Sequence, residues 1–252
     1  STPLYSSAAS DVYKRQLCDD ACDVMLAAKS GKCNRFPVAD CRVFVGRNSC
    51  GVRGIKLMDG DEVISMSILK HTDATTEQRD EYLRLSSALK RIEVPENGDF
   101  DEEAAFNGLE PQMSFEEFKA MRENEQFILT VTSTGYGKRT SAYEYRITAR
   151  GGQGVANMEM SERNKAVVSS FPIEDDNQIM MVTDGGKLIR MPVEDIRIAG
   201  RKTQGVILFR TAEDESVVSV TWLDADDDDE DAELSEEVNE FDGVAAADES
   251  EE

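Results

Sequence analysis

One motif, present in three copies, constrains the fold of this chain more than any other feature. Each copy contains a glycine, an arginine four residues later, and a Gly-Val pair about fifteen residues after that arginine. The anchors read SGKCNR (30–35) with CGV (50–52), TGYGKR (134–139) with QGV (153–155), and GGKLIR (185–190) with QGV (204–206). Three further positions recur between the anchors: an acid (Asp40, Glu144, Asp195), an arginine two residues on (Arg42, Arg146, Arg197) and a second arginine (Arg47, Arg150, Arg201). This regularity indicates three structurally equivalent repeats.

The spacing of the copies predicts a propeller-like architecture. The second and third copies lie 51 residues apart, and the first and second lie 104 apart, about twice that period. A period near fifty is typical of propeller blades. In the third copy, apolar and β-branched runs at 178–183, 187–192, 205–210 and 217–223 are separated by turn residues, which predicts four strands. We therefore expect a mainly β fold with three four-stranded antiparallel blades.

Three blades are fewer than a typical closed propeller contains, so we expect the chain to be part of a larger ring. Without neighbouring blades, the inner face of the first unit, with Val24, Leu26 and Phe36, would lack an apolar partner. Apolar surface left in water costs about 25 cal/mol per Å². The sequence thus predicts only marginal stability for the isolated chain.

Residues 67–126 interrupt the β pattern and predict a helical, acidic insertion. Thr75 and Gln78 have the spacing of a capping box. Apolar side chains follow them at helical intervals: Tyr82, Leu85, Leu89 and Ile92. Ser114 and Glu117 begin a second, shorter helix that includes Phe115, Phe118 and Met121. The acidic segment 96–108 between the two helices is expected to be a mobile surface loop. We favour a tolerated addition at a blade edge, and the alternative is a docking site for a partner.

The expected organisation has six parts. They are an extraneous or disordered leader (1–16), a blade (17–66), the helical acidic insertion (67–126), two blades (127–173 and 174–223), and a disordered acidic tail (224–252). The tail contains 16 acidic and no basic residues, so it cannot bury enough apolar area to offset the entropy of ordering. Its expected role is solubility, competition with nucleic acid for a basic surface of the blades, or both.

Charge is unevenly distributed along the chain. The net charge is -23, but residues 67–126 hold 15 acidic against 7 basic residues, and the tail holds 16 more acids. Residues 127–173 carry six basic and three acidic residues, so the blade sequence itself is close to neutral or positive. This distribution permits a polyanionic partner despite the acidic total.

Other functional classes find little support in the sequence. The five cysteines all lie within residues 18–50 and form no CxxC pair. With a single histidine, His71, the sequence has too few suitable residues for a histidine-based metal site or a catalytic triad. We therefore expect reduced thiols, no metal site, no cofactor and no catalytic residue in this chain. A secretory signal and an apolar run long enough to span a membrane are both missing from the sequence, which favours a cytoplasmic location.

The recurrent cations are the predicted binding residues. An arc of evenly spaced cations suits a bent polyanion, because phosphates accept Lys and Arg contacts whatever the base sequence. The candidate DNA-binding residues are Lys32, Arg35, Arg47, Lys138, Arg139, Arg150, Lys187, Arg190, Arg201 and Lys202. The other set of recurrent arginines, at equivalent positions of the three repeats, is interpreted as structural. Each of them, Arg42, Arg146 and Arg197, lies two residues after an acid with which it could pair.

Several stretches resemble the carboxy-terminal domains of the A subunits of bacterial DNA gyrases. They are GVRGIKLMDGDEVISM, TSTGYGKRTSAYEYRITARGGQGV and TDGGKLIRMPVEDIRIAGRKTQGVILFRTAEDESVVSV. The resemblance covers most of residues 22–223 and implies a β-pinwheel, a propeller variant whose blades exchange strands and whose basic rim wraps DNA. In that family six blades form the domain, so this chain would hold the last three blades and the acidic tail.

The resemblance also implies partners for the chain. These are double-stranded DNA and the gyrase B protein in an A2B2 holoenzyme, in which other domains bind ATP and Mg²⁺ for negative supercoiling. The family's cleavage domain and its tyrosine are missing from this sequence, so the fragment should be non-catalytic. The family's QRRGGKG box is also missing, and ARGGQG (149–154) keeps only part of it. The alternatives are the matching domain of the topoisomerase IV A protein and a propeller that serves as a protein-interaction scaffold.

Overall fold

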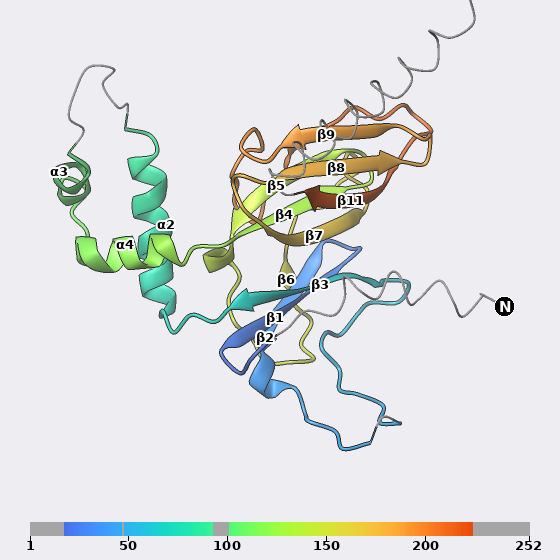
Figure 1. Cartoon of the computed structure of the whole chain (residues 1–252), viewed down its shortest axis with the longest axis horizontal. Coiled ribbons are helices and arrows are strands. Elements are labelled where there is room, and N and C mark those ends of the chain that lie inside the picture. Colours follow the sequence, from blue (N-terminus) through green and yellow to red (C-terminus); the bar gives the residue numbers. More distant parts are fainter. Residues whose placement is uncertain (1–17, 47, 93–100, 224–252) are drawn as a thin grey trace, which may run out of the picture.

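The computed structural model describes residues 18–46, 48–92 and 101–223. Three antiparallel sheets follow one another, and a helical insertion separates the first repeat from the second (Figure 1). The predicted leader (1–16) and acidic tail (224–252) lie outside the described residues.

Each sheet is built around a hairpin that contains one copy of the motif. The first sheet has the order β3-β1-β2-β6, the second β10-β5-β4-β7, and the third β11-β8-β9. The strands of the first two sheets are β1 (Cys22–Ala28), β2 (Lys32–Pro37), β3 (Val63–Lys70), β4 (Phe127–Thr132), β5 (Tyr136–Ser141), β6 (Val155–Ala156), β7 (Val167–Ile173) and β10 (Val206–Ile207). Those of the third are β8 (Gln178–Thr183), β9 (Leu188–Pro192) and β11 (Val217–Leu223). The first blade extends beyond residue 66, because β3 continues to Lys70.

The sheets exchange strands, and this corrects the expectation that each repeat supplies all four strands of its own blade. The strand β6 belongs to the second repeat in sequence but pairs with β2 of the first, with Val155 opposite Cys33. In the same way β10 of the third repeat pairs with β5 of the second, with Val206 opposite Gly137. The run at 205–210 therefore contributes to the preceding sheet, and the third sheet has three strands among the described residues.

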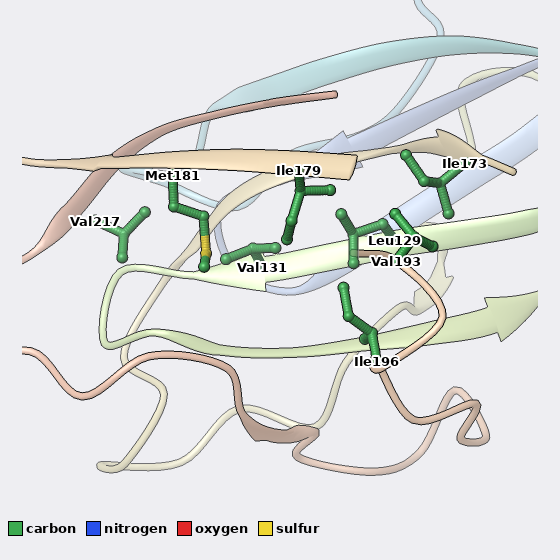
Figure 2. Close-up of a cluster of buried hydrophobic side chains, with 8 residues drawn as sticks. All are labelled: Leu129, Val131, Ile173, Ile179, Met181, Val193, Ile196 and Val217. Atoms are coloured by element: carbon green, nitrogen blue, oxygen red, sulfur yellow. The ribbon is translucent and has the colours of Figure 1, made fainter. Parts of the chain in front are cut away.

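The apolar core lies between neighbouring sheets. Leu129 and Val131 of β4 face Ile179 and Met181 of β8, and all four side chains are fully buried (Figure 2). A second cluster joins the first two sheets through Met25, Ala27, Cys33, Leu69, Ile128 and Tyr145. On the other side of the first sheet, Val24 and Phe36 are also buried, and Gly54 packs against Leu26 and Phe36. The first repeat's own loop thus covers the face that was expected to lack a partner.

The insertion forms a small helical unit with its own core. Its helices are α2 (Thr76–Leu89), α3 (Glu102–Asn107) and α4 (Phe115–Glu123). Both predicted capping boxes are present, at Thr75 with Gln78 and at Ser114 with Glu117. The helix α3 was not predicted, since 96–108 was expected to be a loop; Asp101 caps it and Phe106 is buried among aromatic rings. The unit docks on the second blade through Tyr143, whose hydroxyl donates to the Met121 carbonyl at 2.9 Å.

Candidate nucleic-acid interface

The two short turns that follow β2 and β5 are the places where consecutive repeats meet. η1 (Val38–Asp40) follows β2, and η2 (Ala142–Glu144) follows β5. After the second turn, Ile147 forms a parallel bridge with Arg35, and the equivalent Ile198 of the third repeat bridges Arg139. Each joint thus brings the motif arginine of one repeat against the backbone of the next.

Arg35 is buried at the first joint, with 2% of its surface exposed. Its Nε forms an ion pair with Asp23 Oδ2 at 2.8 Å, and Nη1 and Nη2 donate to the carbonyls of Ala142 (2.8 Å) and Lys70 (2.9 Å). Burial lowers the pKa of the Arg35 guanidinium, and the Asp23 carboxylate opposes this shift. The guanidinium therefore fastens the second repeat to the first.

Arg139 has the same role at the second joint. Its Nε donates to the Ile196 carbonyl at 2.7 Å and its Nη2 to the Glu194 carbonyl at 3.2 Å, while Nη1 is paired with Asp175. The side chain is buried. The prediction that Arg35 and Arg139 contact DNA is thus corrected, because both guanidinium groups bind protein acceptors away from the surface.

Lys138 is fully buried beside Arg139. Its Nζ donates to the carbonyls of Gly200 and Arg201, both at 2.7 Å, and to that of Thr203 at 3.3 Å. Burial lowers the pKa of Lys138 to about 8, and the charge of Glu144 opposes this shift. The equivalent residue of the first repeat, Asn34, donates to the carbonyl of Ala149, which is equivalent to Gly200. Lys138 is therefore also corrected from a DNA contact to a joint residue.

Arg150 and Arg201 bind in the opposite direction, from each repeat back to the preceding one. Arg150 donates from Nε to the Asp40 carbonyl (3.1 Å) and from Nη1 to the Arg53 carbonyl (2.8 Å). Arg201 does the same with the carbonyls of Glu144 (2.9 Å) and Ala156 (2.6 Å). Both side chains are only half-buried, so they also reach the surface of the joint.

The remaining candidates lie nearer to solvent. Lys187 is exposed but paired with Glu215 at 2.6 Å, and Lys32 is half-buried with its Nζ 3.6 Å from Met58 Sδ. Arg190 is exposed and donates from Nε to Gln178 Oε1 at 2.6 Å, and Lys202 is exposed as well. Arg47 lies outside the described residues.

The arginines interpreted as structural are the ones that the fold exposes. Arg42, Arg146 and Arg197 are all exposed, and no ion pair joins them to Asp40, Glu144 or Asp195 within the part of the chain that the structure describes. Glu144 instead accepts from the backbone N–H of Arg201 at 2.7 Å. The sequence held no signal that separates these arginines from Arg35 and Arg139, because Arg146 and Arg197 lie outside the named strands, each one residue before an isolated bridge.

The exposed arginines occupy equivalent positions in the three repeats, and Arg146 and Arg197 lie in the segments that join their repeats to the preceding ones. Guanidinium groups bind phosphate oxygens through paired N–H donors, and a row of them suits a polyanionic backbone more than a single small ligand. The insertion offers the opposite environment, because most of its exposed charged residues are carboxylates. Any phosphate-binding surface therefore lies on the blades.

Residues 18–46, 48–92 and 101–223 contain neither a cluster of metal ligands nor a membrane-spanning helix. No three His, Cys, Asp or Glu side chains gather there to hold a metal ion, and the five cysteines are free thiols. In the same ranges, none of the helices has the length and apolar character needed to cross a bilayer.

Sequence and structure comparisons identify relatives of this chain. A family model described as "DNA gyrase C-terminal domain, beta-propeller" matches residues 23–70, 126–173 and 177–221, one match for each repeat. The DNA gyrase A protein of Granulibacter bethesdensis is 46% identical over 212 residues, covering 81% of this chain and 23% of that protein. The corresponding proteins of Rickettsia bellii (45%, covering 88% of this chain and 24% of the relative) and Salmonella typhimurium (36%, covering 84% and 24%) are also similar.

The chain thus spans about a quarter of the length of these relatives. Among solved structures, the C-terminal domain of DNA topoisomerase IV shares the fold with a TM-score of 0.58 at 18% identity, over 83% of this chain and 49% of that one.

Proposed function

Because the chain belongs to the family of DNA gyrase C-terminal β-propeller domains, we propose that it binds and wraps double-stranded DNA as the C-terminal part of a gyrase A protein. The observation that carries this proposal is the exposed arginine at each repeat, Arg42, Arg146 and Arg197. Lys202 and the half-buried Arg150 and Arg201 extend the same surface. Lys32, Lys187 and Arg190 are secondary contacts, because each already has a protein acceptor nearby.

The chemistry of DNA supports this assignment. Each phosphate that a cation neutralises releases counterions, so affinity rises with the number of exposed cations and falls with salt. Bending a duplex by 40–90° costs on the order of 1–6 kcal/mol over 20–30 base pairs, which several phosphate contacts offset. One exposed arginine lies at the equivalent position of each repeat, so we expect the three to contact separate phosphates of a bent duplex.

The remaining parts of the proposal concern the whole protein. We place this chain in a cytoplasmic type II topoisomerase with the gyrase B protein as partner, in an A2B2 assembly. Cleavage of DNA, hydrolysis of ATP and binding of Mg²⁺ belong to other domains and proteins of that assembly, and the present chain contributes binding without a catalytic residue. The family membership and the exposed arginines support a role in DNA binding for this chain, with catalysis in other domains.

The test compares two triple variants of the chain. Arg42→Ala, Arg146→Ala and Arg197→Ala together should weaken binding to linear duplex DNA and lower the salt slope of log K by about one per lost contact. The matched control removes three exposed cations of the insertion, Arg84→Ala, Lys119→Ala and Arg122→Ala, which changes the net charge equally. The control should leave the slope unchanged. Equal losses in the two variants would show that net charge alone governs binding and would overturn the proposed surface.

A further inference from the structure

The helical unit formed by α2, α3 and α4 is not needed to join one blade to the next. The second and third repeats meet at a joint of the same kind without any helix between them. The family model likewise matches residues 23–70 and 126–173, and the unit lies between these two segments. Figure 1 shows the unit projecting from the side of the sheets, so its outer faces are open to a partner.

The unit carries an apolar pocket on one of these faces. The pocket has a volume of about 330 Å³ and lies between α4 and the segment that leads from β3 into α2. Its apolar walls come from Ala74, Met113, Ala120 and Met121. Both methionines pack with their inner side against the aromatic core of the unit and remain half-buried, and Ala120 is exposed. Methionine side chains adapt their shape, so an apolar group entering here would extend an existing core.

The charges at this pocket are acidic. Asp73 and Glu117 line it and are exposed, and no lysine or arginine lines it among the residues described. Hydrogen bonds from the backbone and side chain of Ser114 lower the pKa of Glu117, which keeps its carboxylate charged. The described part of the insertion, 71–92 and 101–126, contains 12 Asp and Glu against 6 Lys and Arg. A ligand that suits the pocket therefore combines an apolar group with positive charge.

A second pocket adjoins the first and gives the surface its length. It has a volume of about 340 Å³, shares Ala120 and Met121 with the first, and continues past Asn124 to Tyr143. We call the two pockets together the α4 groove. From Glu117 to Asn124 the groove follows α4 for about 10 Å, at about 1.5 Å per residue. This length accommodates about two turns of a helix or about three residues of extended chain.

We propose that the α4 groove docks a basic amphipathic segment of another protein. An apolar side chain of that segment enters between Met113 and Met121, and lysine or arginine side chains beside it lie against Asp73 and Glu117. Binding of an amphipathic segment in an apolar groove is a common mode of peptide recognition. Nucleic acids and anionic lipids are disfavoured, because their phosphates would face the two carboxylates. Metal ions and polyamines lack the apolar group that the walls would bury.

The docking does not depend on the proposed binding of DNA, so both are tested separately. The probe is a synthetic amphipathic peptide of leucine and lysine, about four helical turns long, with its leucines on one face. A second peptide has serine in place of every leucine. Both are titrated without DNA into the full-length chain, in which Asn and Gln replace the Asp and Glu residues of 224–252 so that the tail does not bind the probe. We expect the leucine peptide to bind at least tenfold more tightly, and equal binding of the two peptides would overturn the proposal.

Matched substitutions locate the binding surface. Ala120→Trp fills the groove without changing the charge and should weaken binding of the leucine peptide at least tenfold. Its control, Ala104→Trp at an exposed position of α3, should bind like the parent chain. Asp73→Lys should weaken binding more than Glu103→Lys, which makes the same charge change on α3, and added salt should reduce this difference. All four positions are exposed, so each variant should keep its fold, as measured by circular dichroism. Equal affinities within either pair would contradict the groove as the site.

Methionine methyl signals test the site directly. In a chain labelled with carbon-13 at these methyl groups, the leucine peptide should shift the signals of Met113 and Met121, assigned through Met113→Leu and Met121→Leu. The signal of Met58, which is exposed on the first repeat, should stay in place. If the signals of Met113 and Met121 do not move when the peptide is saturating, the proposal fails and the insertion is a tolerated addition at the edge of a blade.

Discussion

Nε of Arg150 donates a hydrogen bond to the backbone carbonyl of Asp40 at 3.1 Å, and this contact holds the second repeat against the turn that ends η1 of the first. Arg35 crosses the same joint in the other direction, to the carbonyl of Ala142 in η2. Two arginines from different repeats thus each donate hydrogen bonds across the same joint to backbone carbonyls of the other repeat. The recurrence of these arginines in the sequence reflects the assembly of blades, and the exposed arginines are the ones proposed to contact DNA.

Replacing Arg35 by Met should destabilise the chain strongly. The substitution leaves the Asp23 carboxylate buried without its guanidinium partner, and breaking such a buried pair costs about 3–5 kcal/mol. Urea unfolding followed by circular dichroism measures the change. The control Arg42→Met removes an exposed arginine and should alter the free energy of unfolding by less than about 0.5 kcal/mol. Equal costs for the two substitutions would contradict the structural role of Arg35, and adding Asp23→Leu to Arg35→Met should recover part of the loss.

Lys138 should make stability depend on pH in the alkaline range. Its pKa is about 8 in the folded chain, whereas an ordinary lysine, as in the unfolded chain, has a pKa of 10.5. Between pH 8 and 10.5 the unfolded chain therefore binds more protons than the folded one. The free energy of unfolding contributed by this group is therefore constant below about pH 8, rises between pH 8 and 10.5, and levels off above. Unfolding measured from about pH 7 to 10.5 should show this rise relative to Lys138→Met, which lacks the titrating group. Parallel profiles for the two proteins would refute it.

The hairpins and helices could be predicted because their signals are local. Gly31, Gly135 and Gly186 all have positive φ at the hairpin turns, and the capping residues Thr75 and Ser114 begin α2 and α4. Strand exchange could not be predicted from the residues alone, because 205–210 is equally apolar whether it pairs with β9 or with β5. The short helix α3 was missed since its six residues are too few to show a helical period, and it depends on burial of Phe106 among other aromatic rings.

The candidate site shows the same limit. The columns of Arg35 and Arg42 recur equally well in the sequence, and a repeat pattern cannot distinguish a side chain buried in a joint from one on the surface. The difference arises from the fold: β2 turns Arg35 toward Asp23, whereas Arg42 lies in the segment after η1 and is exposed, 5.3 Å from the centre of the Phe44 ring. An arginine that recurs at the same position of every repeat is predicted to have a role there. The structure is needed to show whether its guanidinium binds other protein groups or faces the solvent.

Removing the acidic residues of the tail should strengthen DNA binding. Residues 224–252 carry 16 acidic and no basic side chains, so at low salt they compete with phosphates for the exposed arginines. A variant in which the tail keeps its length, with Asn and Gln in place of Asp and Glu, should bind duplex DNA more tightly. The gain should shrink as salt rises, because screening weakens the competition. A salt-independent gain, or none, would argue against electrostatic competition.

Gly154→Ala should destabilise the first joint more than Gly51→Ala affects the isolated chain. Both glycines have positive φ, at 74° and 63°, so each substitution carries the strain of a left-handed residue, about 1 kcal/mol. Only Gly154 adds a clash, because its Cβ would lie 2.4 Å from the Cys33 carbonyl oxygen, whereas the Cβ of Gly51 meets nothing within 4 Å. Urea unfolding should therefore separate the two variants by more than about 1 kcal/mol. If both variants lost the same free energy of unfolding, the close approach of Gly154 to β2 would be contradicted.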